Sequence, residues 1–560
     1  MTIATSPLRS ALELFYQWEV EKPNAPFLRQ PTGNSWTTIS WAEAGQISRR
    51  IAAALKDMGY QPGDHIGLVS KNCYHWILAD LALMIGGYVS VPFYPTLSAT
   101  QLEEVIRLGD VKAIFVGKLD NWEHMKPGIP ADVPIIAFPH YPGNALVSEG
   151  YQWDDLIAHF APLEGNPKPD IRNLWTILFT SGTTGTPKGV MLDYYAPSAL
   201  MEMERRHNVL KLFQGSEHRF FSYLPLNHIA ERIIVEMAGI LTGGTIFFAE
   251  SLDTFAQNLR AAQPTLFMAV PRIWSKFQLG ILERLPQNKL DMLLKIPIVS
   301  GMIKNKIKSG LGLSKANIML TGAAPTPDAL KDWYKKLGIV IQEVYAQTEN
   351  CGGCTLMPYA KVKSGTVGIP LPDVEIRIHP DNGEVVMRAP WLMMGYYKDE
   401  EKTNEMLRDG WLYSGDQGEI DAEGYLSITG RVADTFKSAK GKFIVPAPLE
   451  WGFAKNNLIE QICVVGLTLP QPVALVVLSE IGKNTQQQEV SKSLKETLVD
   501  VNAELANYER IGKVVVVNEE WTVDNGILTP TMKIKRNVLA QRYAPLLEGW
   551  YAQSAEVVWE

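Results

Sequence analysis

Residues 178–190 read LFTSGTTGTPKGV, an apolar segment that runs into a loop of small and hydroxylated residues. Glycines let backbone amides converge on an anion, the threonines and the serine add hydroxyl donors, and Lys188 adds a positive charge. The stretch predicts a strand followed by a polyphosphate-binding loop; the alternative is a small polar surface loop without a ligand. The residues expected to contact phosphate are Thr180, Ser181, Gly182, Thr183, Thr184, Gly185 and Lys188.

This loop does not fit the Walker motif of P-loop NTPases. The Walker motif needs a glycine directly before its lysine and a serine or threonine directly after it. Lys188 lies between Pro187 and Gly189 and fails at both positions. The sequence also contains no HExxH, GxSxG or GxGxxG motif, so the zinc peptidase, serine hydrolase and dinucleotide-binding classes lack their usual anchors.

Outside the loop, short apolar segments rich in β-branched residues alternate with helix-like stretches such as residues 41–58. The apolar segments are residues 66–70, 112–117, 133–138 and 265–271. This alternation is typical of parallel sheets covered by helices. The apolar window 76–95 contains Asp80, two adjacent glycines and Pro92, which favours a buried helix followed by a strand over a bilayer span.

From about residue 370 the pattern changes to strands joined by turn clusters. Residues 374–390 and 418–431 each place a polar turn between alternating segments, as in an antiparallel sheet. Further strand candidates follow, with a polar helical run near 486–505 and a terminal helix from about Lys533. The expected fold class is α/β, with parallel αβ sheets followed by a β subdomain and, after Arg431, an α+β unit small enough to move as a body.

Charge and cysteine content restrict the partners and the compartment. Lys plus Arg number 53 against 60 Asp plus Glu, a net charge of −7, which disfavours nucleic acid as the main ligand. Four cysteines in 560 residues make no disulfide framework, and the N-terminus lacks a signal-peptide pattern, so we expect a cytoplasmic protein. The apolar and basic residues 289–315 have two interpretations: a solvated helix pair over the core, or a surface that rests peripherally on a membrane.

Beyond the loop, an ordered series of motifs resembles the adenylate-forming superfamily of acyl-CoA synthetases, luciferases and peptide-synthetase adenylation domains. The signature [YF]-T-S-G-T-T-G-x-P-K-G-V is matched over eleven consecutive positions from Thr180. Further similar segments are residues 222–232, 269–274, 321–325, 344–349, 410–420, 430–450 and 528–536. Within the superfamily, the sequence is most similar in appearance to long-chain and bubblegum-type fatty acyl-CoA synthetases.

The resemblance implies a nucleotide site built from several of these segments. The residues that would surround the nucleoside are Gly322, Ala323, Ala324, Tyr345, Asp416 and Arg431. Tyr345 would stack on adenine, and Asp416 would accept both ribose hydroxyls, which suits a carboxylate because it can take two O–H donors. Thr348 would contact a phosphate and Glu349 would bind Mg²⁺.

The resemblance also implies roles in the reaction itself. His228 would border the carboxylate end of the acyl site, and Lys533 would be delivered by the mobile domain to the α-phosphate. Lys535 is the alternative register for this lysine. Asp434 would be the hinge between a large N-terminal domain of stacked αβ sheets with a β subdomain, residues 1–433, and a small mobile α+β domain, residues 434–560. Gly441 would lie along the tunnel for the pantetheine arm of CoA.

Together these features imply a ligase that uses ATP, Mg²⁺ and CoA. A long-chain fatty acid and ATP would give acyl-AMP and pyrophosphate, and CoA would then take the acyl group and release AMP. The alternatives are an enzyme that stops at acyl-AMP, one that transfers to a carrier protein, and a ligase for medium-chain or aryl acids. A non-enzymatic acyl or nucleotide sensor is disfavoured because Lys188, Glu349, Asp416 and Lys533 are all present.

Overall fold

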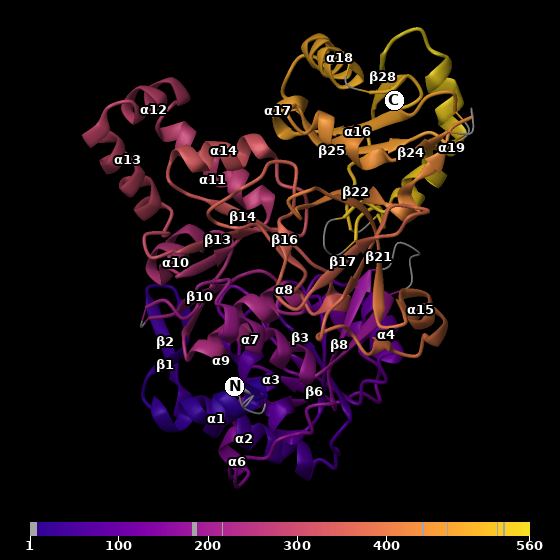
Figure 1. Cartoon of the computed structure of the whole chain (residues 1–560). Helices are drawn as coiled ribbons and strands as arrows, with labels where there is room; N and C mark the ends of the chain where they lie inside the picture. Colours follow the sequence, from indigo (N-terminus) through magenta and orange to yellow (C-terminus); the bar gives the residue numbers. More distant parts are fainter. Residues whose placement is uncertain are drawn as a thin grey trace. The chain divides into compact units, whose positions relative to one another are not determined.

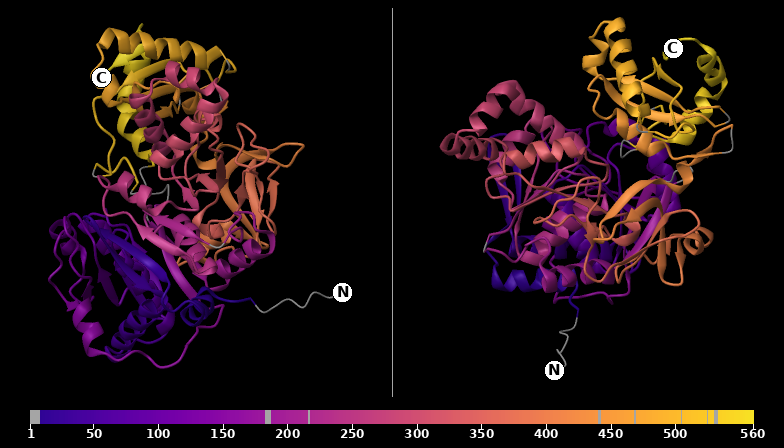
Figure 2. Two further views of the ribbon diagram at one scale, coloured as in Figure 1. Left: turned by 90° about the vertical axis from the view of Figure 1, so that its left-hand side faces the viewer. Right: turned by 45° about the horizontal axis from the view of Figure 1, so that its top comes forward.

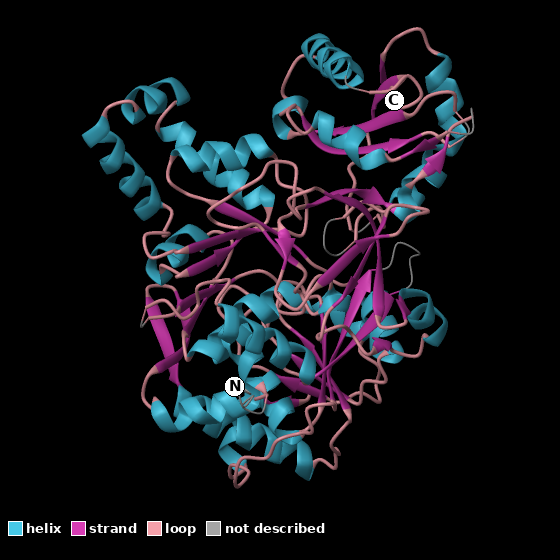
Figure 3. Cartoon of the chain, viewed as in Figure 1, coloured by secondary structure: helices cyan, strands magenta, loops and turns pink. Residues whose placement is uncertain are grey.

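The computed structural model describes residues 8–181, 187–215, 217–439, 442–467, 469–503, 505–523, 525–529 and 533–560. The chain divides into two compact units (Figure 1). The first unit comprises Met1–Thr180, Pro187–Glu375 and Met387–Leu412; the second comprises Ser181–Thr186, Ile376–Val386 and Tyr413–Glu560. Figure 3 distinguishes the helices and strands that make up each unit.

An eight-stranded sheet of order β19-β9-β8-β4-β3-β5-β6-β7 lies in the first unit. The strands are β3 His65–Val69, β4 Val89–Phe93, β5 Ala113–Val116, β6 Ile135–Ala137, β7 Tyr151–Gln152, β8 Leu174–Ser181, β9 Pro187–Asp193 and β19 Gly395–Tyr396. The central strands run parallel and are buried, as expected of a sheet covered on both faces. Helix α4 (Ala99–Leu108) packs on it through Leu102, Val105 and Ile106. The strands predicted at 66–70, 112–117 and 133–138 are confirmed.

The apolar window 76–95 forms a buried helix and a strand, as predicted. Helix α3 (Tyr74–Gly86) ends where Gly87 adopts φ = 71°, a left-handed conformation that favours glycine. Asp80 lies on this helix, fully buried, and pairs with the buried guanidinium of Arg232. A buried carboxylate needs such a partner, so α3 is a core helix. Among the described residues, no helix combines the length and hydropathy that a bilayer span requires.

Two smaller sheets complete the first unit. Their orders are β10-β11-β1-β2 and β12-β13-β14-β15-β16. The strands are β1 Pro26–Thr32, β2 Ser35–Ser40, β10 Arg219–Ser222, β11 Thr245–Phe248, β12 Leu266–Met268, β13 Ile318–Thr321, β14 Ile341–Tyr345, β15 Thr355–Leu356 and β16 Ile369–Pro370. Parallel strands β12, β13 and β14 end at the same edge, the usual place for ligands in such sheets.

The antiparallel region predicted from residue 370 is present. Strands β17 (Glu375–Ile378), β18 (Glu384–Arg388), β21 (Trp411–Ile420) and β20 (Leu407–Arg408) follow one another in a sheet, and β22 (Leu426–Arg431) pairs with β21. The β21–β22 pair is antiparallel, with Asp416 opposite Arg431. The predicted turns therefore join neighbouring strands.

The C-terminal part of the second unit is a four-stranded sheet of order β25-β26-β27-β28 with helices on both faces. The elements are β25 Ile459–Val465, β26 Val473–Leu478, β27 Lys513–Val516, β28 Val557–Trp559, α16 Pro446–Phe453, α18 Gln487–Ala503 and α19 Arg536–Ala552. Leu475 faces the core under α19 while Val476 faces the core under α18, because successive strand residues point to opposite faces. Both views of Figure 2 show α18 and α19 as separate layers in orange and yellow.

Helix α19 starts three residues later than the predicted position, Lys533. A β-bridge joins Leu528 to Ile534 and keeps the chain extended up to that point. Lys535 is the residue that precedes the helix. The α/β class is confirmed.

Candidate active site

Lys188 and Glu349 meet at one tyrosine in the first unit. Strand β19 pairs antiparallel with β9 and places Tyr396 opposite Val190, two residues from Lys188. The Tyr396 hydroxyl donates a hydrogen bond to Glu349 Oε1 at 2.7 Å. Lys188 Nζ lies 5.9 Å from the centroid of the Tyr396 ring, within the range of a cation–π contact. The lysine of the predicted phosphate loop and the predicted metal ligand therefore share a neighbour.

A short turn holds Glu349 in place. Thr348–Asn350 form one turn of 3₁₀ helix after β14. The Asn350 side chain accepts from the backbone of Gln347 at 2.9 Å and donates to Met387 Sδ at 3.0 Å. The Glu349 carbonyl accepts from the backbone N–H of Met393 at 2.8 Å. The backbone of the turn is thus bonded on both sides, which restricts where the carboxylate can point.

Burial and the neighbouring charges shift the pKa values of Tyr396 and Lys188. Burial, followed by the charge of Glu349, raises the pKa of Tyr396 far above its ordinary value, so the hydroxyl stays protonated and donates at neutral pH. Burial, with the like charge of Lys402, lowers the pKa of Lys188, while carboxylates that include Glu349 oppose this shift. Two cations beside each other favour an anionic ligand, because an added negative charge stabilises the charged form of both.

Gly322 and Tyr345 lie at the ends of neighbouring strands. Thr321 of β13 is opposite Glu343 of β14. A Cβ on Gly322 would lie 2.7 Å from Val344 Cγ2 and 2.9 Å from Val344 O, closer than any real Cβ approaches. The protein's own backbone therefore requires this glycine. The place of Gly322 beside the nucleoside stays a prediction.

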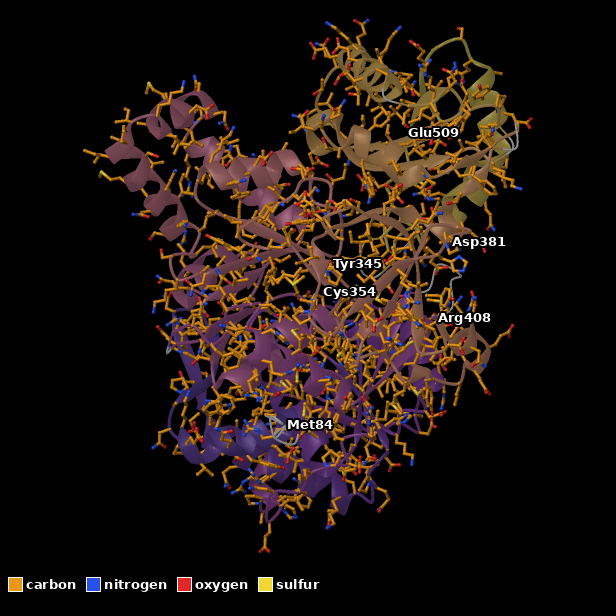
Figure 4. The ribbon with its side chains drawn as sticks, viewed as in Figure 1. Met84, Tyr345, Cys354, Asp381, Arg408 and Glu509 are labelled. Atoms are coloured by element: carbon orange, nitrogen blue, oxygen red, sulfur yellow. The ribbon has the colours of Figure 1, made fainter. Side chains whose placement is uncertain are left out.

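The neighbouring positions complete this edge of the sheet. Ala323 has φ = 65°, a strained left-handed conformation for alanine, and Ala324 follows it. Tyr345 is the last residue of β14 and pairs with Thr355, so it lies close to Cys354, as Figure 4 shows. The stretch 322–324 and Tyr345 are thus brought to one place.

His228 caps a short helix that touches the segment after Glu349. Its Nδ1 accepts a hydrogen bond from the backbone of Ala230 at 3.2 Å, at the start of α8 (Ile229–Glu231). Ile229 of this helix packs against Gly352, because a Cβ on Gly352 would lie 3.6 Å from Ile229 Cγ1. The predicted acyl-site histidine and the predicted metal ligand are therefore on packed segments of one unit.

The two predicted ribose contacts form an ion pair in the second unit. Arg431 Nε lies 2.9 Å from Asp416 Oδ1, and the two residues are opposite each other in the β21–β22 ladder. The Asp416 side chain is 8% exposed and the Arg431 side chain is 45% exposed. The arginine holds the carboxylate in one orientation and compensates for its burial.

Lys533 is exposed on an extended segment of the second unit. Thr529 and Lys533 exchange hydrogen bonds: the Lys533 N–H donates to Thr529 Oγ1 at 3.0 Å, and the Thr529 N–H donates to the Lys533 carbonyl at 2.8 Å. Lys535 precedes helix α19 directly. The two candidate lysines therefore differ in local structure: Lys533 is on the extended segment and Lys535 is the residue just before the helix.

Sequence reasoning singled out neither Arg536 nor Tyr396, although both contact predicted site residues. Arg536 forms a bidentate pair with Glu450 at 2.6 and 2.9 Å and lies 3.6 Å from Asp434 Oδ2, the predicted hinge residue. It therefore ties the segment after Lys533 to that hinge residue. No sequence pattern singles out one arginine or one tyrosine among many, so only the three-dimensional contacts identify them.

Part of the predicted phosphate-binding loop lies outside the described residues, namely Gly182, Thr183, Thr184 and Gly185. The predicted tunnel residue, Gly441, also lies outside them. Ser181 ends β8, and Thr180 Oγ1 donates to the carbonyl of Lys188 at 3.4 Å. The strands on either side of the loop are therefore linked at its base.

Solved structures share this fold. An anthranilate CoA ligase in complex with anthranoyl-AMP has a TM-score of 0.77 at 19% identity and covers 98% of this chain and 100% of its own. The adenylation domain of a carboxylate reductase from Mycobacterium chelonae has a TM-score of 0.77 at 22% identity, with 98% and 92% covered. The fold is that of adenylate-forming enzymes.

The chain belongs to the AMP-binding enzyme family. The model of that family matches residues 15–397, and the model of the AMP-binding enzyme C-terminal domain matches residues 433–555. The family predicted from the motifs is confirmed. A long-chain-fatty-acid–CoA ligase of Mycobacterium tuberculosis is 28% identical over 589 residues, 96% of each chain. The long-chain-fatty-acid–CoA ligase ACSBG2 of Rattus norvegicus is 28% identical over 630 residues, 96% of this chain and 92% of its own.

Proposed function

We propose that the chain is an AMP-forming fatty acid–CoA ligase that prefers long-chain acids. The observation that carries the adenylation chemistry is the cluster of Lys188, Tyr396 and Glu349, in which a cation and a carboxylate meet on a buried tyrosine. The nearly full-length similarity to named long-chain-fatty-acid–CoA ligases supports the substrate and the acceptor.

In the first step, a fatty carboxylate oxygen attacks the α-phosphorus of ATP. The bond between that phosphorus and the oxygen that bridges it to the β-phosphate breaks, and pyrophosphate leaves. Lys188 and the loop donors neutralise the departing phosphates, and Tyr345 with the 322–324 edge holds the adenine. Asp416, oriented by Arg431, accepts the ribose hydroxyls. Lys533 stabilises the charge that develops at the α-phosphate.

Glu349 is the residue that would hold Mg²⁺. Its Oε1 is occupied by the Tyr396 hydroxyl, and Oε2 has no partner among the described residues. Those residues contain no cluster of three metal-ligating side chains. This fits Mg²⁺, which binds through one or two carboxylates together with substrate phosphates rather than in a protein cage. When bound, the ion supplies charge neutralisation on the phosphates.

In the second step, the CoA thiolate attacks the acyl carbonyl carbon and AMP leaves. We infer that residues 434–560 rotate about Asp434 relative to residues 1–433 between the two steps. The rotation withdraws Lys533 from the α-phosphate and brings the segment that contains Gly441 to the acyl-AMP. Asp434 ends a 3₁₀ turn directly after β22, and its contact with Arg536 couples that turn to the segment that carries Lys533. A short polar residue tolerates the backbone change that such a rotation requires.

The experiment measures pyrophosphate, AMP and ADP with palmitate alone, with CoA added, and with a phosphopantetheinylated carrier protein added. We expect at most one equivalent of pyrophosphate without an acceptor, and multiple turnovers with equal AMP and palmitoyl-CoA when CoA is present. Turnover with the carrier protein alone would assign that acceptor instead, and ADP formation would contradict the proposal.

A matched pair of variants tests the site. Lys188→Met should abolish most pyrophosphate release, because it removes the cation beside the departing phosphates. Lys398→Met removes a positive charge that pairs with Asp110 instead and should keep most of the activity. Equal effects of the two substitutions would mean that net charge alone matters.

A further inference from the structure

A helical hairpin of the first unit has one face on the core and one face in solvent. It consists of α12 (Gln287–Leu294) and α13 (Pro297–Gly310), drawn in dark rose in Figures 1 and 2. Leu290 is buried, and Ile303 and Ile307 pack against the same core cluster. These contacts attach the hairpin to the unit, so the orientation of its outer face is defined by the fold.

The outer face exposes large apolar side chains. Met292 is 58% exposed, Ile296 45%, Ile298 81% and Met302 67%. Ile298 and Met302 are four residues apart and lie on the same side of α13, which has no buried residue at all. Single exposed apolar residues are common, but a group of them on one hairpin is typical of an interaction surface.

The same segment is strongly basic in an acidic protein. Residues 287–315 contain six lysines and one acid, Asp291, although the whole chain has a net charge of −7. Lys315 pairs with Glu217 at 2.7 Å. Within the described part of the chain, no carboxylate lies at ion-pair distance from Lys289, Lys295 or Lys306, and all three are exposed. Their charges are therefore available to a partner.

We propose that this hairpin docks on an anionic lipid bilayer. Met292, Ile296, Ile298 and Met302 would enter the interface between headgroups and acyl chains, and the lysines would lie among the lipid phosphates. Apolar side chains flanked by lysines match such an interface, which is apolar inside and negatively charged outside. The charge complementarity selects an anionic surface over a neutral one. This docking requires only the hairpin and does not rest on the proposed reaction.

The first experiment is co-sedimentation of the full chain with vesicles of phosphatidylcholine, alone or mixed with phosphatidylglycerol. We expect binding to the mixed vesicles that weakens at high salt, as the Debye length falls from about 10 Å at 0.1 M to about 3 Å at 1 M. Ile298→Ser combined with Met302→Ser should lower the partition coefficient at least tenfold. Lys289→Ala and Lys306→Ala should each lower it about fivefold.

A second experiment places a probe on the outer face. The four cysteines are all buried, so a polarity-sensitive fluorophore attached through Met302→Cys reports from one position. We expect a blue shift on the mixed vesicles. The control is Val20→Cys: Val20 is 78% exposed on α1 (Ala11–Glu21), which Figure 1 draws at the opposite end of the first unit. It should show no shift.

Three results would overturn the proposal: equal binding to neutral and anionic vesicles, unchanged binding after the double serine substitution, or a shift at Val20 equal to that at Met302. Concentration-dependent dimerisation that the double substitution removes would assign the face to a second copy of the chain and contradict it as well. Vesicle binding by a chain that fails to form acyl-AMP would refute the proposed function and leave this inference standing.

Discussion

Tyr396→Phe removes one hydroxyl and leaves the ring that faces Lys188. In the folded chain that hydroxyl donates to Glu349 Oε1 at 2.7 Å, and the side chain is 4% exposed. Water therefore cannot easily replace the lost donor. Because Glu349 is the proposed metal ligand, the hydroxyl acts on the reaction through it, as a positioning group.

The expected loss is substantial. A hydrogen bond to a charged group contributes about 1.5–3 kcal/mol. Loss of a partner that orients a metal ligand costs about 10–100-fold in metal affinity or activity, and the two ranges agree because about 1.4 kcal/mol is one factor of ten. We expect kcat/KM for adenylation to fall about 10–100-fold and the Mg²⁺ concentration for half-maximal rate to rise.

The assay is pyrophosphate release titrated with Mg²⁺. The matched control is Tyr397→Phe, since the neighbouring tyrosine also donates to a carboxylate, Asp110 Oδ2 at 2.6 Å, but not to Glu349. In a Glu349→Gln background, Tyr396→Phe should have little further effect on the Mg²⁺ dependence. The reasoning is refuted if Tyr396→Phe keeps kcat/KM within twofold and leaves the Mg²⁺ dependence unchanged, or if Tyr397→Phe has the same effect.

Three further predictions concern single positions. Lys533→Ala should slow acyl-AMP formation about 10²–10³-fold and spare thioester formation from supplied acyl-AMP; a larger effect of Lys535→Ala would reverse the assignment of the two lysines. Gly441→Leu should show the opposite pattern, with pyrophosphate–ATP exchange intact and CoA ester production blocked; loss of both would remove its proposed role. Burial raises the pKa of Glu231 from 4.5 to about 8, so the folded state holds a proton that the unfolded state releases. The unfolding temperature of the wild type should therefore fall between pH 4.5 and about 8, and that of Glu231→Gln should fall less; parallel curves would contradict the shift.

Elements with a clear period could be predicted from the sequence. The run 112–117 became β5, and residues 41–58 became helix α2 (Trp41–Asp57), which begins with a capping box between Ser40 and Glu43. In both cases the local pattern and the tertiary packing agree. The start of the terminal helix could not be predicted in this way. The β-bridge between Leu528 and Ile534 delays that start, and no local sequence pattern encodes the bridge.

The candidate site likewise contains residues that the sequence could predict and contacts that it could not. The motifs located Lys188 and Glu349, but their connection through Tyr396 arises from the pairing of β19 with β9, strands about 200 residues apart. The motifs also singled out Gly322, as a residue beside the nucleoside, and that role stays a prediction. Its closest neighbour is Val344 of the adjacent strand, which only the register of β13 and β14 could show.

The most direct test of the proposed function is kcat/KM for saturated acids from two to eighteen carbons, measured with ATP, Mg²⁺ and CoA, with benzoate as the aryl comparison. Each buried methylene contributes about 0.8 kcal/mol, so an extended acyl site can favour long acids strongly. We expect formation of AMP with an optimum at about twelve carbons or more. An optimum at eight carbons or fewer, or a preference for benzoate, would contradict the long-chain assignment.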